Sequence, residues 1–190
     1  MNVPLITRAA EGYDRRAFTV TEVKAMVRAG IMDEDEPVEL WEGEFVPMNA
    51  KHNRHEIWKM RLMRKLARAL PDEIEVSVGP TLYLSETSFL DPDLLIYATG
   101  PLPVDVRGPD CLLVVEIADT SLARDLQGKA RLYALHGVRH YWVLDAENRR
   151  AHLLSRPDGE RYMDRVVVEV DGELTLPFEP SLKIRLADLG

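Results

Sequence analysis

Three residues in the middle of the chain have the side chains that metal-assisted chemistry needs. Asp93 and Glu116 each lie at a hydrophobic segment typical of a buried strand, and Lys129 follows in a segment with helical spacing. In α/β sheets, acids at strand ends can converge on one hard divalent cation, which prefers oxygen ligands and usually keeps several waters. Such a cation polarises a phosphate and lowers the pKa of an attacking water. The pattern therefore favours hydrolysis of a phosphodiester bond.

The same residues also have a simpler interpretation. Single acids at strand ends are common, so Asp93 can be a turn residue and Glu116 an ion-paired one. Asp125, Lys129 and Tyr133 are spaced by four residues, which places them on one face of a helix. That spacing predicts either an Asp–Lys pair worth about 0.3–0.5 kcal/mol followed by a packing tyrosine, or a lysine that stabilises charge on the scissile phosphate.

Length and composition indicate one domain spanning residues 1–190, with residues 1–17 as an N-terminal extension. No apolar run approaches the roughly 20 residues of a membrane helix, and the first residues lack the pattern of a signal peptide. We therefore expect a cytoplasmic protein with no membrane partner. Cys111 is the only cysteine, which excludes an intrachain disulfide and a cysteine-built zinc site.

The net charge of −8 argues against a protein that coats nucleic acid without specificity. Basic residues nevertheless gather in one predicted helix, at Arg54, Lys59, Arg61, Arg64, Lys65 and Arg68. This segment is either a solvated helix face or a surface for nucleic acid or an acidic partner. In the second case, Arg54, Lys59 and Arg61 are the candidates for contact with nucleic acid.

Hydrophobic periodicity and turn residues predict an α/β fold. Helices are expected at residues 19–29, 52–70 and 122–136. Strands are expected at 38–41, 44–48, 74–84 (interrupted at Gly79–Pro80), 94–97, 112–117, 140–144, 151–154, 161–170 and 173–176. The strand–helix–strand order over 112–144 implies a parallel crossover. Glu42–Gly43 predicts an N-terminal hairpin, and Asp171–Gly172 predicts a tight hairpin in a β-rich C-terminal end.

Five segments carry a resemblance to a known family. They are Gly43-Glu44-Phe45-Val46 before a His-bearing helix, Pro92-Asp93, Val115-Glu116-Ile117, Asp125-x3-Lys129-x3-Tyr133-x3-Gly137-Val138, and Tyr141-Trp142-Val143-Leu144-Asp145. In these segments the chain resembles the Uma-type family of restriction-endonuclease-like bacterial proteins, within the PD-(D/E)xK nuclease superfamily. The resemblance covers roughly residues 18–186, and its most specific part is the run from Glu116 to Asp145.

The resemblance implies a central mixed sheet flanked by helices and a nuclease that depends on Mg²⁺ or Mn²⁺. Asp93 would match the motif aspartate and Glu116 the motif glutamate, and the carbonyl of Ile117 would be a third metal ligand. The superfamily lysine is expected at position 118, where this chain has Ala118. Lys129 on the following helix is its natural substitute.

The start of the basic helix holds two further candidates. The family places a histidine there, which either His52 or His55 can match, and some superfamily nucleases use a helix glutamate near the metal. His55 and Glu56 are assigned supporting roles with Asp125 and Tyr133. His55 also shares a helix face with Trp58 and Leu62, so a core or capping role is an equal alternative. Asp119 is a further acid that could act through water.

Three functions follow from these residues. The first is a metal-dependent nuclease acting on nucleic acid, most simply DNA; a homodimer would let two such sites cut both strands. The second is a catalytically silent relative that binds nucleic acid or protein, which the net charge and Ala118 favour. The third is a structural interaction protein without affinity for metal.

Overall fold

The computed structural model describes residues 6–7, 15–49 and 52–190, in a chain of 190 residues. Much of the predicted N-terminal extension, residues 1–5 and 8–14, lies outside the described residues. Its described part forms a short antiparallel pair of β1 (Ile6–Thr7) and β2 (Arg15–Arg16).

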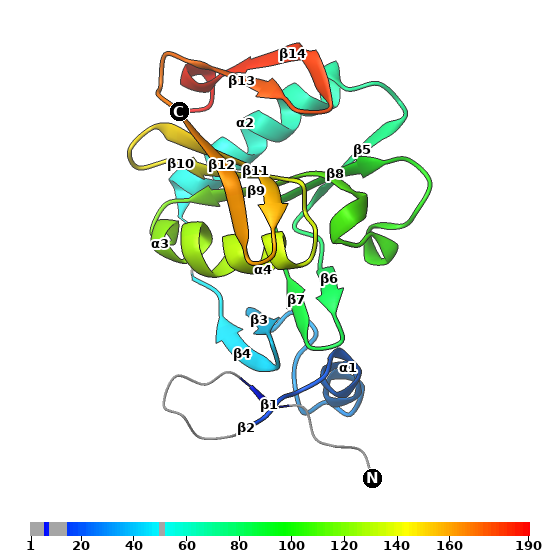
Figure 1. Ribbon diagram of the computed structural model, residues 1–190. Coiled ribbons are helices and arrows are strands. Elements are labelled where there is room, and N and C mark those ends of the chain that lie inside the picture. Colours follow the sequence, from blue (N-terminus) through cyan, green and yellow to red (C-terminus); the bar gives the residue numbers. More distant parts are fainter. Residues whose placement is uncertain (1–5, 8–14, 50–51) are drawn as a thin grey trace.

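A six-stranded mixed sheet forms the centre of the molecule (Figure 1). Its order is β12 (Arg161–Val168), β11 (Arg150–Asp158), β10 (His140–Asp145), β9 (Cys111–Ala118), β8 (Leu94–Ala98) and β5 (Ile74–Val78). β9 and β10 are parallel, and the other neighbours are antiparallel. The predicted α/β class and the parallel crossover are thereby confirmed.

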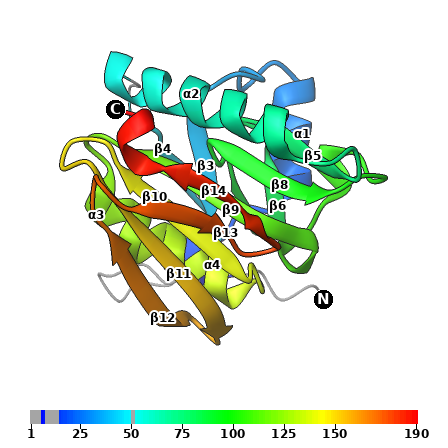
Figure 2. The same ribbon diagram turned by 90° about the horizontal axis from the view of Figure 1, so that it is seen from above.

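One face of this sheet is covered by helix α2 (Asn53–Ala69) and by the hairpin of β13 (Glu173–Leu176) and β14 (Glu179–Arg185), as Figure 2 shows from above. The four-residue spacing of Trp58, Leu62 and Leu66 lines one side of α2, and these side chains enter the same core as Leu113 and Val115 of β9. A final turn, η4 (Leu186–Asp188), follows β14.

The opposite face is covered by one helical segment made of three parts. They are α3 (Leu122–Arg124), a single π-helical turn η3 (Asp125–Lys129), and α4 (Ala130–Leu135). Because side chains alternate along a strand, Val114 and Ala118 of β9 enter the core on this face together with Tyr133. Glu116 has the same parity as Val114 and Ala118, so the strand directs it toward this helical segment.

A second, smaller sheet lies beyond that helical segment. Its order is β4 (Glu44–Pro47), β3 (Val38–Trp41), β7 (Ser88–Leu90) and β6 (Leu82–Ser85), with α1 (Val20–Arg28) beside it (Figure 1). Glu42 and Gly43 both have positive φ, at 48° and 89°, which two-residue type I′ turns require. A Cβ at Gly43 would also overlap Ala17. The predicted N-terminal hairpin is confirmed.

Several details differ from the sequence predictions. The segment 74–84 is two strands in different sheets, and β7 and β14 were not predicted. Two short turns that were not predicted, η1 (Pro103–Asp105) and η2 (Gly108–Asp110), lie between β8 and β9. None of the helices within the described ranges is long and apolar enough to cross a membrane.

The predicted tight hairpin at Asp171–Gly172 is wrong. β12 pairs with β11, whereas β13 pairs with β14 in a separate sheet. The cause is the apolar face of the last two strands, because Leu174, Leu176 and Ile184 are buried in the core beneath α2. Burying these side chains there takes the chain away from the edge of the central sheet after β12.

Candidate active site

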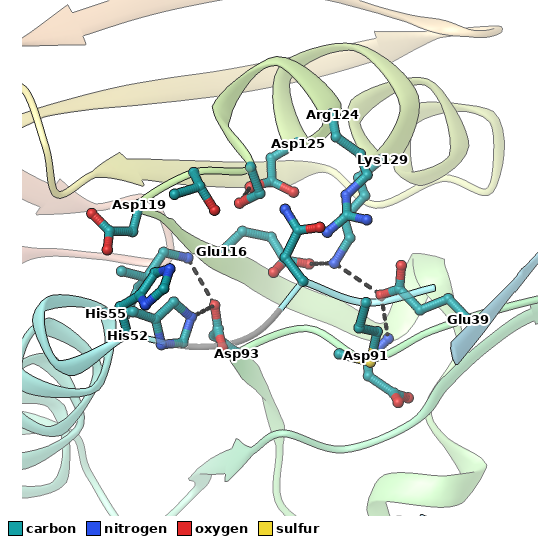
Figure 3. Close-up of a pocket in the computed structure, with 15 residues that line it drawn as sticks. Glu39, His52, His55, Asp91, Asp93, Glu116, Asp119, Arg124, Asp125 and Lys129 are labelled. Carbon is teal, nitrogen blue, oxygen red and sulfur yellow. Dashed lines mark hydrogen bonds and ion pairs between the residues drawn. The ribbon is translucent and has the colours of Figure 1, made fainter. Parts of the chain in front are cut away.

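A small pocket lies where β8, β9, α2, η3 and β3 meet, and its volume is about 50 Å³. By this measure one water needs roughly 10–15 Å³, so the pocket has room for an ion with a few waters. The antiparallel register Leu94↔Val115 brings Asp93, which precedes β8, beside Glu116 of β9. Figure 3 shows both carboxylates among the side chains that line the pocket.

Asp93 is buried and is held by two groups from different elements. Its Oδ2 accepts a hydrogen bond of 2.9 Å from the backbone N–H of Ile117, and Nε2 of His55 lies 2.8 Å from the same oxygen. His55 is buried on α2, with Nδ1 3.0 Å from Oε1 of Glu56. The buried histidine thus joins Asp93 to the outer surface of the helix, where Glu56 is half exposed.

Glu116 is held from the opposite side, by the helical segment that follows its strand. Its Oε1 accepts hydrogen bonds from Nζ of Lys129 at 2.8 Å and from the hydroxyl of Tyr133 at 3.0 Å. Its Oε2 accepts no hydrogen bond from any residue in the described part of the chain. Glu116 therefore has one oxygen fixed by the protein and one left for a ligand.

Lys129 has a second carboxylate partner that the sequence did not indicate. Its Nζ forms an ion pair of 2.9 Å with Oε1 of Glu39, on β3 of the smaller sheet. Glu39 is buried, and it accepts hydrogen bonds of 3.0 Å from Nε1 of Trp41 and from the backbone N–H of Asp91. The smaller sheet therefore completes the site by holding the lysine.

The π-helical turn sets which side chains reach the pocket. Lys129 and Tyr133 both contact Glu116, so they lie on one face of this segment, as the four-residue spacing predicted. Asp125 lines the same pocket but accepts a hydrogen bond from Ser121, and among the described residues it forms no ion pair with Lys129. The simple Asp–Lys pair is therefore wrong, because the lysine is directed to Glu116 and Glu39 instead.

Gly128 allows the π-helical turn to approach the smaller sheet. A Cβ at this position would overlap the ring of Trp41, whose Nε1 binds Glu39. The hydroxyl of Tyr141 donates a hydrogen bond of 3.1 Å to the backbone carbonyl of Asp125 within the same turn. Both contacts fix the backbone of the turn that leads into Lys129, and π turns of this kind occur often at functional sites.

Burial shifts the pKa values of the charged groups in this pocket. Burial raises the pKa of Glu116 well above its ordinary value; Lys129 opposes this shift, and the neighbouring charge of Asp93 adds to it. Burial likewise raises the pKa of Asp125. Burial alone would lower the pKa of Lys129, but Glu116 and Glu39 outweigh it and raise that pKa, so the lysine stays charged.

Comparison with known proteins identifies the family. The family model Uma2, described as "Putative restriction endonuclease", matches residues 22–187. The chain belongs to the Uma2 family. The predicted resemblance is thereby confirmed. A comparison with curated proteins gave no match.

A solved structure has the same fold as this Uma2 chain. It is the crystal structure of "a putative nuclease belonging to DUF820 from Anabaena variabilis ATCC 29413", with a TM-score of 0.71 and 17% sequence identity. The match covers 90% of this chain and 97% of the other. At this identity the likeness concerns the fold alone, which is restriction-endonuclease-like as predicted.

The pocket of the Uma2 chain has the charge that a hard cation requires. Four buried acids, Glu39, Asp93, Glu116 and Asp125, line it together with one buried ammonium, that of Lys129. Within the described ranges, no group of three or more acidic, histidine or cysteine side chains is already arranged around one metal position. Mg²⁺ commonly binds through one or two carboxylates and several waters, so Asp93 and Glu116 fit such an ion as the two protein side chains.

The basic helix of the Uma2 chain faces two different neighbours. At its start, Arg54 forms an ion pair of 3.3 Å with Asp119, at the edge of the pocket, and Lys59 pairs with Glu56 at 2.8 Å. Farther along, Arg61 donates a hydrogen bond of 3.2 Å to the carbonyl of Leu189 near the C-terminus. Only the start of the helix therefore adjoins the site.

Sequence reasoning missed several pocket residues of the Uma2 chain, among them Glu39 and Arg124. Glu39 was read as part of a hairpin strand; the available signal was an acid between apolar neighbours in a strand predicted to be buried. Arg124 also lines the pocket, and its place one residue before Asp125 was the only indication. Neither signal identifies the partners, which come from other elements.

Proposed function

We propose that this Uma2 chain is a nuclease that uses Mg²⁺ or Mn²⁺ to hydrolyse phosphodiester bonds in nucleic acid, most simply DNA. The observation that carries the proposal is the meeting of Asp93 and Glu116 from adjacent strands, with Lys129 hydrogen-bonded to Glu116. The family description and the nuclease described for the similar structure support the same reaction class.

In this proposal Asp93 and Glu116 hold the cation, with the carbonyl of Ile117 as a third ligand. When bound, the cation polarises the phosphate and supplies a water of lowered pKa. His55 and the Ile117 N–H fix the orientation of Asp93, and Tyr133 fixes that of Glu116. Because these side chains are already fixed, they lose little conformational freedom when the substrate binds.

Lys129 is proposed to stabilise negative charge on the phosphate as the bond breaks. Its Nζ lies against Glu116, so a phosphate bound beside that carboxylate comes within its reach. Glu39 keeps the ammonium charged and in place, from a sheet that carries no proposed metal ligand. This arrangement lets Lys129 on the helix replace the superfamily lysine, which would fall at Ala118.

The remaining assignments are part of the same proposal. Arg54, at the edge of the pocket, is the best placed of the three proposed nucleic-acid contacts, and Lys59 and Arg61 lie farther along the same helix. We propose a single domain over residues 1–190, a cytoplasmic location, and a homodimer where both strands of a duplex are cut.

One observation favours a second function, a silent member of the fold that binds nucleic acid or protein. Lys129 contacts two carboxylates, so much of its charge is already balanced before any substrate binds. The two functions differ in turnover, because the silent protein would bind without cutting.

The experiment that separates them measures cleavage of plasmid DNA, single-stranded DNA and RNA with Mg²⁺ or Mn²⁺, and again after the metal is removed with EDTA. We expect cutting that requires the metal and is lost in Glu116→Ala. Calorimetry should show that Glu116→Ala also abolishes tight metal binding. Lys129→Ala should stop cleavage in the same assay but retain metal binding by calorimetry. Unchanged metal affinity in Glu116→Ala would refute the assignment of the site. No cleavage of any substrate by the wild type would favour the silent function.

A further inference from the structure

A phosphate that approaches this pocket meets an excess of negative charge. The described residues that line it include the acids Glu39, Asp91, Asp93, Glu116, Asp119 and Asp125. Two cations near the pocket are already paired, since Lys129 contacts Glu116 and Glu39, and Arg54 contacts Asp119. A divalent cation offsets only part of this charge, so a phosphodiester needs a further cation at the same place.

Arg124 has the properties of that cation. It lines the pocket, it comes from α3 next to the π-helical turn, and it forms no ion pair with an acid in the described part of the chain. Figure 3 shows Arg124 and Lys129 extending into the pocket from the same helical segment, with Asp93 and His55 on the other side.

Among the described residues, Arg124 forms one hydrogen bond, which uses one of its five N–H donors. Nη1 donates to the carbonyl of Pro47 at 2.8 Å, which fixes the guanidinium against the end of β4. Its Nε is buried and has no hydrogen-bond partner in the described part of the chain. A guanidinium has five N–H donors in a planar arrangement suited to phosphate oxygens. An anchored side chain with unmet donors is better explained by a ligand than by stability of the free chain.

We propose that Arg124 binds a backbone phosphate of the nucleic acid at the pocket, beside Lys129. The inference rests on the proposed function for the identity of the ligand, but it does not depend on cleavage. Arg124 is then the substrate-binding cation, whereas Lys129 is the cation held against the proposed metal ligand Glu116.

The test measures binding in a background that cannot cut. Glu116→Gln keeps the shape of the side chain and an oxygen that accepts from Lys129 and Tyr133, and it removes one negative charge from the pocket. Fluorescence anisotropy of labelled duplex DNA, single-stranded DNA and RNA is recorded over a series of salt concentrations. Arg124→Met, Arg124→Lys and Arg139→Met are each added to this background. Arg139 is an exposed residue beyond α4, and its substitution causes the same change in net charge.

We expect Arg124→Met to weaken binding about tenfold and to lower the slope of log K against log salt by about 0.7–0.9, the value for one lost phosphate contact. Arg124→Lys should retain the salt slope, because it keeps the charge, while losing part of the affinity. Arg139→Met should change neither quantity by a comparable amount. Thermal unfolding of each variant identifies any loss caused by a loosened β4.

Equal affinity and slope in Arg124→Met and Arg139→Met would overturn the inference and leave the nuclease proposal standing. Binding that depends on Arg124, in a wild-type protein that cuts no nucleic acid, would support the phosphate site and refute the nuclease.

Discussion

Glu116 and Asp145 are buried acids at the ends of two neighbouring parallel strands, β9 and β10, and the sequence around each looks alike. Their surroundings are different. Asp145 is bound by the backbone N–H and the side-chain amide of Asn148 and by Nε of Arg150, all within five residues of it. Glu116 is bound by Lys129 and Tyr133, which lie 13 and 17 residues away on another element.

The difference shows what distinguishes a turn acid from an acid assigned to a site. The partners of Asp145 come from the turn that follows it, so these contacts need no other element of the fold. Lys129, the cation beside Glu116, is buried and also forms an ion pair with Glu39 of a different sheet. It contacts Oε1 of Glu116, and Oε2 accepts no hydrogen bond from the described residues. Burial of Glu116 therefore brings a raised pKa and an open oxygen, which a purely structural acid does not need.

The largest expected effect separates the two acids by activity. Glu116→Gln should lower the cleavage rate by about 10⁴-fold, as loss of an essential catalytic group does. Asp145→Asn should keep the rate within a few-fold of the wild type and instead destabilise the fold by about 1–2 kcal/mol through weakened turn hydrogen bonds. Cleavage rates and urea unfolding of both variants decide the matter. Equal loss of activity in both would remove the distinction.

The next largest expected effect is on stability, when the cation beside each acid, Lys129 or Arg150, is replaced. Lys129→Met should destabilise the protein by about 3–5 kcal/mol, because it leaves buried carboxylates without their ammonium. Arg150→Met should cost no more than about 1 kcal/mol, since Arg150 is partly exposed and its pair with Asp145 is screened by water. Urea unfolding measures both.

A matched double variant sharpens this result. Lys129→Met combined with Glu116→Gln should recover part of the lost stability, because one of the unpaired charges is removed. A double variant as unstable as the sum of the two single variants would show that Lys129 and Glu116 do not interact energetically.

Substitution of Glu39 should have a smaller effect on activity than substitution of Glu116. Glu39→Gln keeps one oxygen that can accept from the backbone N–H of Asp91 and from Lys129, but it loses the acceptor for Nε1 of Trp41 and the charge that faces Lys129. We expect kcat to fall about 10–100-fold, as for other residues that orient an active group, with metal affinity unchanged by calorimetry. Asn148→Ala, beside Asp145, is the matched control. A change in metal affinity without a change in kcat would contradict a positioning role for Glu39.

The smallest effect concerns pH and stability without metal. An acid whose pKa is raised by folding contributes stability that is complete below its unfolded pKa and is lost as pH rises through the folded pKa. Glu116, with an ordinary value of 4.5, has such a raised pKa. Raising the pH above about 4.5 should therefore destabilise the wild type more than Glu116→Gln. Each kcal/mol of unfolding free energy lost should lower Tm by about 2–4 °C.

Thermal unfolding from pH 4 to pH 8 in EDTA checks this prediction. The Tm of Glu116→Gln relative to the wild type should increase with pH. Parallel curves for the two proteins would mean that Glu116 has the same proton affinity in the folded and unfolded states.

Local sequence was enough to predict the elements around the pocket, and it failed for contacts between distant segments. The contact of Lys129 and Tyr133 with Glu116 was foreseeable because both residues lie on the crossover after β9. Glu39 was missed because its contact with Lys129 joins two sheets. The π-helical turn was missed because no residue type requires it, and the hairpin at Asp171–Gly172 failed because the apolar face of β13 is buried in a different layer.

The π-helical turn described above also bears on how this chain tolerates change in length. Each residue in an α-helix advances the side chains by about 100°, and the wide turn adds a residue that offsets α4 from α3 by that rotation. Deletion of one codon among residues 126–128 would let the helix run continuously. It would rotate Lys129 relative to Asp125 by about 100° about the helix axis, so the two side chains would no longer both point into the pocket. Every residue of the pocket would remain in the sequence, yet the pocket would not assemble. In this segment the number of residues therefore carries information that their identities do not.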